Sequence, residues 1–464
     1  MSSVSTQLAA CSPQTFYSNS AAVHVEAGSA IELTTGGHLT NNGHISTGPS
    51  TRFEESYSGI SVNGADVTVV NHGAVMGGSN GIKAKDAVVL TNTGAITGQK
   101  GAGLKSKGNA EVVNYGVITG ADTQRARQND GDGDGLDIDK FGRIHNYGII
   151  EGTGANGSDK HGAPNTSEGI AIGGADIYNH GLISGAHHGV LVDNGNAGPA
   201  FGSTLLVNNG SIRGRNGYGV NLVGNFNDRV INNGLISGGN GVALNMGGGD
   251  DVLTVRGQAR FRGEVDGGSG TNQVILDDIE GGMFNGARQV QHLDVTAGAW
   301  TLTGALEANQ RGRVQSGATL INQSRIGGTV AVEQGATYAG GTVNELDVAG
   351  TLVLDPALKN QGRIKRDLNM TQGSTLALKV GQGETHSTLK VGNRASLGGA
   401  TLSIQIEHES DELLNRQLRI VDAAQIEGRF ERITSNLETL TPELIYTATG
   451  AFVSFKRKKP ADEA

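Results

Sequence analysis

The chain has 464 residues, of which 75 are glycine and only 4% are aromatic, and its formal net charge is −9. The negative charge argues against nucleic acid as a partner. The single cysteine, Cys11, excludes an intramolecular disulfide, and no apolar stretch reaches the length of a transmembrane helix.

The first part of the chain, residues 1–30, is interpreted as an N-terminal cap or leader. Its opening string, MSSVSTQLAACSPQ, has neither the basic region nor the long apolar run of a secretory signal peptide. The string from Leu8 to Cys11 is similar to a lipoprotein cleavage site. Because no apolar segment precedes it, we do not expect lipidation.

Residues 31–250 are dominated by a repeat of asparagine, any residue and glycine, with an aliphatic residue two positions after the glycine. A degenerate copy begins at Asn41, and full copies begin at Asn71, Asn92, Asn114, Asn146, Asn179, Asn208 and Asn232. The closest copies define a unit of about 22 residues, and wider spacings add insertions. Such self-similarity indicates a solenoid.

A second motif alternates with the first, because glycine followed by an aliphatic residue opens a short strand, as at Gly103-Leu104. The unit therefore reads as strand, turn, strand, turn, strand. Strands of four or five residues leave no room for helical crossovers, so they coil, and each coil pairs with the next at about 4.8 Å. We predict an all-β chain that folds as a right-handed parallel β-helix, a solenoid. Asparagine and glycine are expected at its corners because they tolerate positive φ, and stacked asparagine amides are expected to bond to one another.

The outward positions of the glycine-aliphatic strands stack into columns of charge. Lysines at 83, 85, 105 and 107 precede aspartates at 137 and 139. We expect Lys105 to face Asp137 and Lys107 to face Asp139. One interpretation is a solvated charge ladder, worth about 0.2–1 kcal/mol per pair. The other is a lysine patch for anionic glycans, made of Lys83, Lys85, Lys105 and Lys107.

Residues 129–139 form the densest acidic cluster of the sequence. Asp130, Asp132 and Asp134, followed by glycine, match the opening of a calcium-binding EF-hand loop. An EF-hand is excluded because Phe141 stands where the loop requires glutamate and no helices flank it. The alternatives are a looser calcium site at the three aspartates and a polar, glycine-rich excursion. No other cofactor is predicted.

Tyr115 and Tyr147 occupy the same place in consecutive copies of the repeat, so we expect their rings to stack on the outside. They are interpreted either as packing within the ladder or as a platform for a sugar ring. Insertions at 121–134 and 153–168 leave from one corner, and loops on a rigid scaffold commonly carry binding functions.

Enzyme motifs occur without their structural context. Residues 77–81 fit the G-x-S-x-G elbow of hydrolases, yet no helix follows them. Asp137 and Asp139 would lie about 6.5–7 Å apart on one strand face, which suits paired catalytic carboxylates, but beside lysines they look structural. His187 and His188 are expected to point to opposite strand faces and not to share a metal. We predict no catalytic residues.

The sequence changes near residue 250, where the asparagine repeat stops. Residues 251–380 carry shorter strand-turn units, such as Gly-Ala-Thr-Leu at 317–320, and are interpreted as further β-helix. Residues 381–455 have longer and less regular strands and predict a β cap. The tail, 456–464, is basic and polar.

Two late stretches resemble the passenger domain of Gram-negative autotransporters of the pertactin-like kind. Residues 389–402, LKVGNRASLGGATL, resemble the family's L-x-V…A-x-L-G-G…L stretch. Residues 418–430, LRIVDAAQIEGRF, resemble its L-x-I-V-x-A…I-x-G-x-F stretch. The resemblance implies that residues 381–455 act as an autochaperone region, which caps the β-helix and nucleates its folding during secretion.

Complete autotransporters also carry a signal peptide and a C-terminal translocator barrel, and this sequence shows neither pattern. We expect either a trimmed or mature passenger, or an orphan passenger that is exported otherwise. The resemblance implies a secreted virulence protein at the cell surface or outside a Gram-negative bacterium, associated with the outer membrane only through a barrel.

The function that we expect from the resemblance is that of a non-catalytic adhesin or self-association protein, acting in aggregation or biofilm formation. Its partners would be glycans or proteins of host or bacterial surfaces. The alternative is a β-helical carbohydrate-active enzyme, of the polysaccharide lyase or hydrolase type. That alternative needs catalytic groups gathered on one face, and Asp137 with Asp139 is the one candidate pair.

Overall fold

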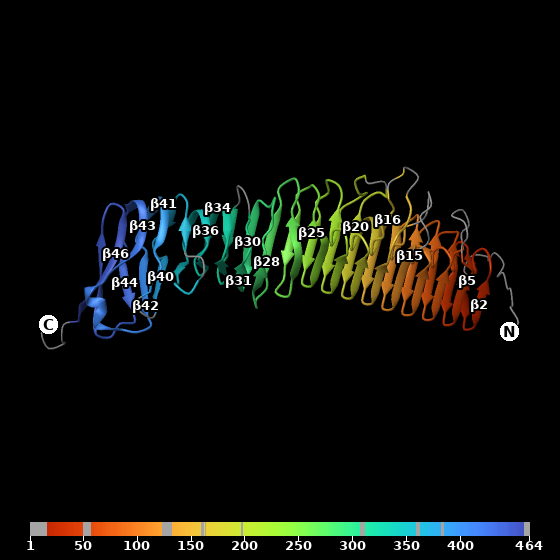
Figure 1. The fold of residues 1–464 in the computed structure, drawn as a ribbon, viewed down its shortest axis with the longest axis horizontal. Helices are drawn as coiled ribbons and strands as arrows, with labels where there is room; N and C mark the ends of the chain where they lie inside the picture. The colour runs from red at the N-terminus through yellow and green to blue at the C-terminus, as the bar shows by residue number, and fades with distance from the viewer. Residues whose placement is uncertain are drawn as a thin grey trace. The chain divides into compact units, whose positions relative to one another are not determined.

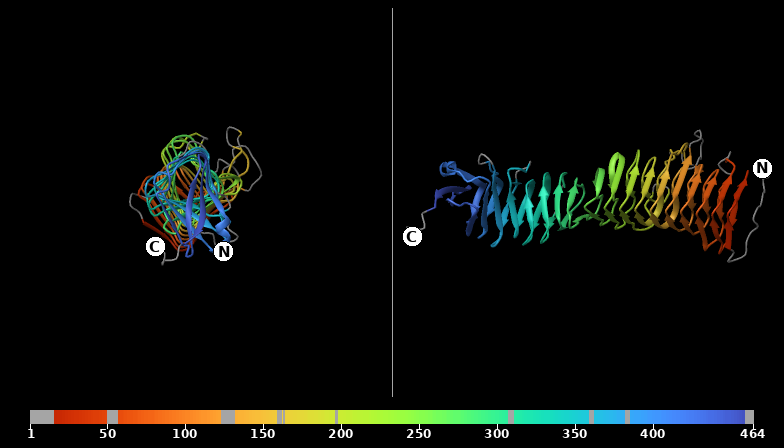
Figure 2. Two further views of the ribbon diagram at one scale, coloured as in Figure 1. Left: turned by 90° about the vertical axis from the view of Figure 1, so that its left-hand side faces the viewer. Right: turned by 90° about the horizontal axis from the view of Figure 1, so that it is seen from below.

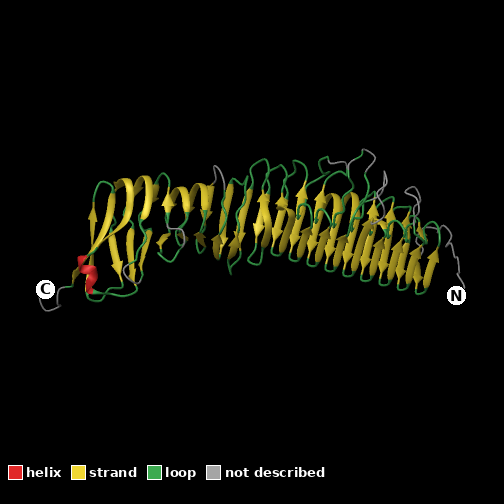
Figure 3. Ribbon diagram, in the orientation of Figure 1, coloured by secondary structure: helices red, strands yellow, loops and turns green. Residues whose placement is uncertain are grey.

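The computed structural model of the chain describes residues 16–49, 57–122, 132–158, 162, 164–195, 198–306, 311–358, 362–381 and 385–458. Strands dominate these residues, and their one helical segment is the 3-10 turn η2 (Asp411–Asn415) (Figure 3). Across the described ranges, no helix is both long and apolar enough to span a membrane. The chain divides into two compact units: unit 1 is Met1–Leu253 with Gln258–Gly270, and unit 2 is Thr254–Gly257 with Thr271–Ala464.

Unit 1 is built from three columns of short strands, and each strand pairs in parallel with its counterparts in neighbouring coils. Column A ends at the repeat asparagine: β1 (Phe16–Asn19), β4 (His38–Asn41), β7 (Val67–Asn71), β10 (Val88–Asn92), β14 (Ala110–Asn114), β16 (Leu136–Asn146), β18 (Ile170–Asn179), β21 (Leu205–Asn208) and β24 (Arg229–Asn232). β26 (Val252–Val255) spans the division between the units.

Column B follows the N-x-G turn and holds its aliphatic residue. Its strands are β2 (Ala22–Val25), β5 (His44–Thr47), β8 (Ala74–Gly77), β11 (Ala95–Gly98), β15 (Val117–Asp122), β17 (Ile149–Gly152), β19 (Leu182–Gly185), β22 (Ser211–Gly214), β25 (Leu235–Asn245) and β27 (Arg260–Asp266). A short strand, β12 (Lys100–Gly101), pairs antiparallel with β15.

Column C starts at the glycine-aliphatic motif. It comprises β3 (Ile31–Leu33), β6 (Ile60–Val62), β9 (Ile82–Ala84), β13 (Leu104–Ser106), the first residues of β16 and β18, then β20 (Val190–Val192) and β23 (Val220–Leu222). The predicted order of strand, turn, strand, turn, strand is confirmed. The fold is a parallel β-helix, and the successive arrows of unit 1 can be followed in Figures 1 and 2.

The core of unit 1 combines aliphatic side chains with a buried column of asparagines. Each repeat asparagine from Asn19 to Asn208 donates from Nδ2 to Oδ1 of the next asparagine at 2.7 to 2.9 Å, as far as Asn232. From Asn41 onward these side chains are fully buried. The amide ladder satisfies polar groups that would otherwise be buried without partners. The expected asparagine stacking is therefore confirmed.

The glycines of the N-x-G turns serve a close backbone approach. A Cβ on Gly94 would lie 1.9 Å from the carbonyl oxygen of Gly73, and a Cβ on Gly116 would lie 2.0 Å from that of Gly94. Among the described residues, positive φ occurs at none of the repeat asparagines and at none of these turn glycines. The expectation that they serve positive φ is wrong, because side-chain bonding selects the asparagine and backbone packing selects the glycine.

Unit 2 is built from two stacks of parallel strands. The first contains β28 (Gln273–Asp277), β30 (His292–Ala297), β32 (Arg311–Val314), β34 (Arg325–Val332), β36 (Thr342–Val348), β38 (Arg363–Ile364), β39 (Leu368–Met370), β41 (Leu389–Ser396) and β43 (Gln417–Glu427). The second contains β29 (Gly282–Phe284), β31 (Ala299–Leu302), β33 (Thr319–Asn322), β35 (Thr337–Ala339), β37 (Thr351–Leu354), β40 (Thr375–Val380), β42 (Thr401–Ile406) and β44 (Arg432–Ser435).

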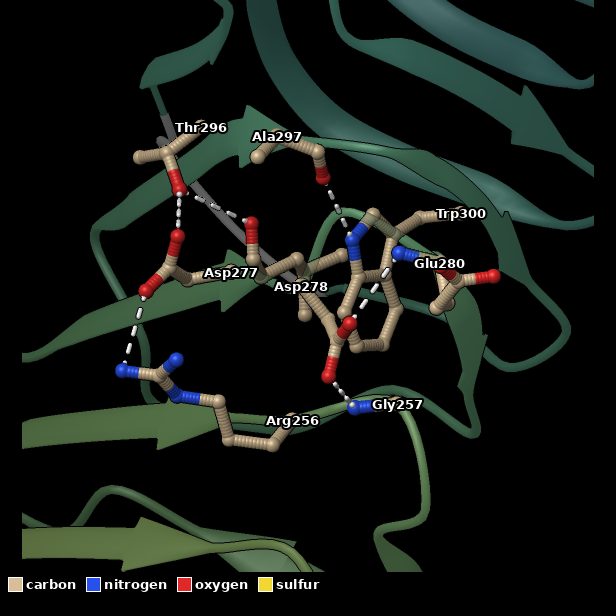
Figure 4. Close-up of polar contacts among 9 residues, drawn as sticks. Arg256, Gly257, Asp277, Asp278, Glu280, Thr296, Ala297 and Trp300 are labelled. Atoms are coloured by element: carbon tan, nitrogen blue, oxygen red, sulfur yellow. Dashed lines mark hydrogen bonds and ion pairs between the residues drawn. The ribbon is translucent and has the colours of Figure 1, made fainter.

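Large buried side chains fill the coils of unit 2. Trp300 is fully buried, and its indole N–H donates to the carbonyl oxygen of Ala297 at 2.9 Å. Figure 4 shows the polar contacts around it, where Arg256 pairs with Asp277 at 3.2 Å and Thr296 donates to the same carboxylate at 2.8 Å. The tryptophan thus anchors one corner of the coil and keeps its polar atom satisfied.

The end of unit 2 changes from parallel to antiparallel pairing. β45 (Leu440–Tyr446) and β46 (Gly450–Arg457) form a hairpin, and β46 also pairs antiparallel with β43. Glu409 accepts backbone hydrogen bonds from Glu438, Thr439 and Leu440 and so ties the chain before β45 in place. An antiparallel end of this kind is a capping β region, because it stops the succession of parallel coils.

Candidate functional site

The predicted lysine column exists on column C of unit 1. Lys83 and Lys105 are direct register partners on β9 and β13, and Lys105 is in turn the partner of Asp137 on β16. Lys105 and Asp137 form an ion pair, which confirms the first expected contact. The Asp137 charge raises the pKa of Lys105, whereas burial, followed by the charges of Lys105, Lys107 and Lys85, lowers the pKa of Lys83. The four lysines therefore act on one another.

The second expected contact, between Lys107 and Asp139, is not formed. The register of β13 with β16 ends at Ser106 and Ile138, so it does not carry Lys107 onto Asp139. No ion pair joins these two described side chains. Burial and the neighbouring Asp137 charge raise the pKa of Asp139. The column thus holds one ion pair, and Lys83 is the register neighbour of its lysine.

An exposed aromatic surface runs along the N-x-G corner. Tyr115 and Tyr147 stack with ring centroids 4.9 Å apart and an interplanar angle of 8°, which confirms the predicted outward stack. Tyr147 continues to His180 at 5.0 Å, and beside this column His145 stacks on Tyr178 at 4.7 Å. Tyr115 is 57% exposed and Tyr147 is 45% exposed. We call these five rings the aromatic surface.

A shallow hollow of about 280 Å³ lies on the outward side of the same strands. Val89 and Phe141 form an apolar part of its lining, and both are more than a third exposed. Glu111 and Arg143 line it as well, with an ion-pair distance of 3.7 Å between them. Arg143 and His145 are two residues apart on β16 and share its outward face. The hollow and the aromatic surface therefore lie along one face of column A.

The predicted calcium cluster is only partly described. Asp130 lies outside the described residues. Asp132 and Asp134 are brought together with Asp137, because one carboxylate oxygen of each lies within 4.8 Å of the others. The structure thus gathers acidic groups at this corner, and calcium binding there stays a prediction.

Three successive coils place an ionisable side chain directly before the glycine that opens column C: Asp134, Glu168 and His188. Asp134 is 1% exposed and Glu168 is 2% exposed. The backbone N–H of Glu168 donates to Oδ1 of Asp134 at 2.7 Å. The charged part of this corner is therefore buried inside the coil and not displayed on its surface.

The protonation of the buried corner follows from its contacts. Burial first, and then the charge of Glu168, raises the pKa of Asp134 well above its usual value. Burial alone would raise the pKa of Glu168, but the neighbouring polar side chains of His187, Asp134 and Thr166 bring it below its usual value. The pKa values of Asp134 and Glu168 are therefore shifted in opposite directions.

The expectation that His187 and His188 point to opposite strand faces is wrong. Both lie in the bend between β19 and β20 and not in an extended strand, so their rings do not alternate between faces. The ring centroids are 4.0 Å apart, and each ring brings a nitrogen within 4.8 Å of a Glu168 carboxylate oxygen. The sequence held a signal for this corner, namely the ionisable residue before the column C glycine in consecutive coils.

Comparisons with known proteins identify no family for the chain. No family model matches the chain, and no curated protein matches its sequence. Among solved structures, the chain is similar to the Hap adhesin of Haemophilus influenzae, with 10% sequence identity and a TM-score of 0.31. The match covers 95% of this chain and 59% of that one, so this chain spans less than two thirds of the Hap chain.

Proposed function

We propose that this chain is a non-catalytic adhesin that binds glycans through the aromatic surface and the hollow beside it. The observation that carries the proposal is the stack of Tyr115, Tyr147 and His180, whose rings are held parallel and outward by neighbouring coils. Aromatic rings that face solvent lack the stabilisation that burial of their apolar surface would give. A sugar ring laid across them recovers that burial, because its C–H face packs on an aromatic face.

The hollow supplies the remaining features of a sugar site. Val89 and Phe141 offer apolar contact, while Glu111 and Arg143 offer hydrogen-bond acceptors and donors at its edge. Binding sites for small molecules combine an apolar floor with a few polar groups in this way. The length of the face, over several coils, suits an extended glycan rather than a single monosaccharide.

The lysine patch is a second contact region for glycans that carry negative charge. Lys83, Lys85 and Lys107 stand near Lys105, and their mutual repulsion is relieved when an anion binds. Such a contact is screened by salt. Acidic glycans are therefore expected to bind more tightly than neutral ones at low ionic strength.

The setting that we propose is the surface of a Gram-negative bacterium, where the chain acts as an autotransporter passenger with an autochaperone region over 381–455. The two late stretches that resemble the family lie largely on β41 and β43, and β43 pairs with the antiparallel end of unit 2. Adhesion to host or bacterial surfaces, or association between copies of this chain, would be the outcome of glycan binding there.

We propose no catalytic activity because the candidate acidic side chains are either paired with lysine or buried. Asp137 is occupied by its ion pair with Lys105, so it and Asp139 do not form a free pair of acids. Asp134 and Glu168 are buried and in contact with each other, which leaves no room between them for a glycosidic bond. Bond cleavage would have to use groups other than these.

The test is a glycan array of neutral and acidic glycans, followed by incubation of every bound polysaccharide and measurement of new reducing ends or unsaturated products. We expect binding without product. The double variant Tyr115→Ala/Tyr147→Ala should weaken binding about tenfold, since each aromatic contact contributes about 0.5–1.5 kcal/mol. Product formation would contradict the adhesin and favour the polysaccharide-active enzyme.

Two further variants separate the contact regions. Phe16→Ala is the matched control, because Phe16 is an exposed aromatic that pairs with His38 away from the aromatic surface. Replacing all four lysines of the patch with glutamine should remove the salt-sensitive part of binding to acidic glycans only. Phe16→Ala should bind like wild type. If the tyrosine variant also binds like wild type, the aromatic surface is not the site.

A further inference from the structure

The buried corner of unit 1 gathers metal-ligand side chains that the adhesin proposal does not use. Glu168, His187 and His188 each bring one ligand atom within 4.8 Å of the other two. They come from two consecutive coils, with Glu168 ahead of β18 and the histidines ahead of β20. The coil stacking itself therefore sets the spacing of the three groups.

Unsatisfied atoms point into the same corner. Oε1 of Glu168 and Nδ1 of His187 are buried without a hydrogen-bond partner, although they lie 3.4 Å apart, and Oδ2 of Asp134 is in the same state. An unsatisfied buried polar atom costs about 1–3 kcal/mol, and more when it is charged. Three unsatisfied atoms that can ligate a metal therefore cost free energy at this corner unless an ion or molecule binds there.

The charges of the corner favour a cation. The Glu168 side chain is only 3% exposed, so water solvates its carboxylate poorly. The His188 ring is buried beside it, with its centroid 4.0 Å from that of the His187 ring. A neutral imidazole does not repel a cation, and metal ligation requires that form.

We propose that Glu168, His187 and His188 form a binding site for a divalent transition-metal ion of the Zn²⁺ class. Two imidazole nitrogens with one carboxylate oxygen are ligands that such ions prefer. Asp134 accepts a hydrogen bond from the Glu168 backbone N–H and so holds the chain at this ligand in place, as groups around metal sites commonly do. His187 has a side chain that is 38% exposed, so the ion has a route in from solvent.

Metal binding requires one hydrogen bond to be exchanged. The backbone N–H of Tyr218 donates to Nδ1 of His188 at 3.0 Å, so the neutral ring carries its proton on Nε2. Ligation through Nε2 moves that proton to Nδ1, and ligation through Nδ1 uses the accepting lone pair. Either route gives up the contact with Tyr218 in favour of the metal bond.

Calcium is the competing ion, because Asp132, Asp134 and Asp137 form the neighbouring acidic group. Calcium prefers six to eight oxygen ligands and does not favour imidazole. Lys105 already pairs with Asp137, and Oδ1 of Asp134 already accepts a hydrogen bond from the Glu168 backbone N–H. An ion of the Zn²⁺ class is therefore expected to bind at Glu168, His187 and His188 rather than at the three aspartates.

The experiment uses the full chain, prepared without a histidine tag and stripped with a chelator that is then dialysed away. Zn²⁺ titration by calorimetry should show one site per chain, and Co²⁺ should give visible absorption bands of a nitrogen-ligated ion. His187→Ala and Glu168→Gln should each weaken Zn²⁺ binding by more than about tenfold, the loss seen even for groups that only orient a ligand. Far-UV circular dichroism checks that both variants fold.

His145→Ala is the matched control, since His145 is a histidine on the aromatic surface and outside the corner. It should bind Zn²⁺ like wild type. Absence of Zn²⁺ binding in the wild-type chain, or full binding in His187→Ala, would overturn the proposal. Ca²⁺ binding that Asp132→Asn abolishes and His187→Ala leaves intact would assign the corner to the acidic group instead. Glycan binding is measured separately, so either proposal can fail alone.

Discussion

The two units of the molecule hold their coils together by different means. Unit 1 stacks a buried asparagine at each N-x-G corner, and the amides bond from coil to coil. Unit 2 fills its coils with large side chains such as Trp300 and Tyr338, and it ends in an antiparallel hairpin. The same parallel pairing is thus supported by a polar ladder in one unit and by apolar bulk with a cap in the other.

This difference explains where binding groups lie. An asparagine ladder fixes the register of every coil, so side chains at equivalent positions repeat outside it at constant spacing. Tyr115, Tyr147 and His180 stack for that reason. In unit 2 the repeat is shorter and irregular, and its described residues form no stacked aromatic column of this kind.

The largest expected effect is on the core of unit 2. Trp300→Ala should destabilise unit 2 by about 3–5 kcal/mol, because it removes a fully buried tryptophan and leaves a cavity. Guanidinium unfolding followed by circular dichroism measures it, with Trp300→Phe as the milder control. An equal loss in the unfolding step of unit 1 would show that the units do not unfold separately.

The next effect is on the asparagine ladder. Asn114→Ala should destabilise unit 1 by about 2–5 kcal/mol, because Nδ2 of Asn92 and Oδ1 of Asn146 each lose a buried partner. Asn233→Ala, at the less buried middle position of a turn, should change the stability of unit 1 by at most about 0.5 kcal/mol. Equal effects of the two substitutions in the same unfolding assay would mean that the ladder is not what supports unit 1.

The pH dependence of unit 1 supplies a smaller test. Burial, and to a lesser extent the Asp251 charge, raises the pKa of Asp228 to about 7, although Asp228 accepts a hydrogen bond from the Thr204 N–H. The folded state then binds a proton more tightly than the unfolded one. This contribution to stability is fully present below about pH 4 and is lost as pH rises toward 7, at no more than about 1.4 kcal/mol per pH unit.

Asp228→Asn keeps an oxygen that can accept from Thr204 but removes the titration. The difference in unfolding free energy between the variant and wild type should therefore vary with pH between 4 and 7 and become constant above that range. A difference that is constant over the whole range would show that Asp228 ionises in the folded chain as it does in the unfolded one.

The smallest effect is at the cap of unit 2. Hydrogen bonds from Glu438, Thr439 and Leu440 outweigh the opposing effect of burial and lower the pKa of Glu409. The contribution of Glu409 to the stability of the cap is therefore present above about pH 4.5 and is lost as pH falls through the folded-state pKa. This pH dependence is opposite in direction to that of Asp228. Glu409→Gln should raise hydrogen exchange in β45 and leave unit 1 unchanged. Unaltered exchange in β45 would mean that Glu409 does not hold the cap.

The sequence predicted the fold well where its signals were periodic. The N-x-G repeat gave the strand order of unit 1, the pairing of Lys105 with Asp137 and the stacking of Tyr115 on Tyr147. It could not give the role of the turn glycines, since their contact with the carbonyl oxygen of the previous coil is visible only in three dimensions.

The buried corner escaped prediction for a different reason. The prediction for His187 and His188 holds only for an extended strand, whereas the chain bends there and brings both rings together. Glu168 lies at the end of an insertion, where the sequence has no periodic pattern from which its position could be predicted. Glu168 and Asp134 each stand directly before the glycine that opens column C. This equivalent position in successive coils brings them together, although they are far apart in the sequence.

The most direct test of the account is to measure glycan binding by the full chain and by the Tyr115→Ala/Tyr147→Ala variant, with product analysis on the same samples. The account predicts that the wild-type chain binds and leaves every glycan intact, and that the variant binds about tenfold more weakly with its β-structure unchanged. Equal binding by both proteins, or release of cleaved glycan by the wild type, would contradict it.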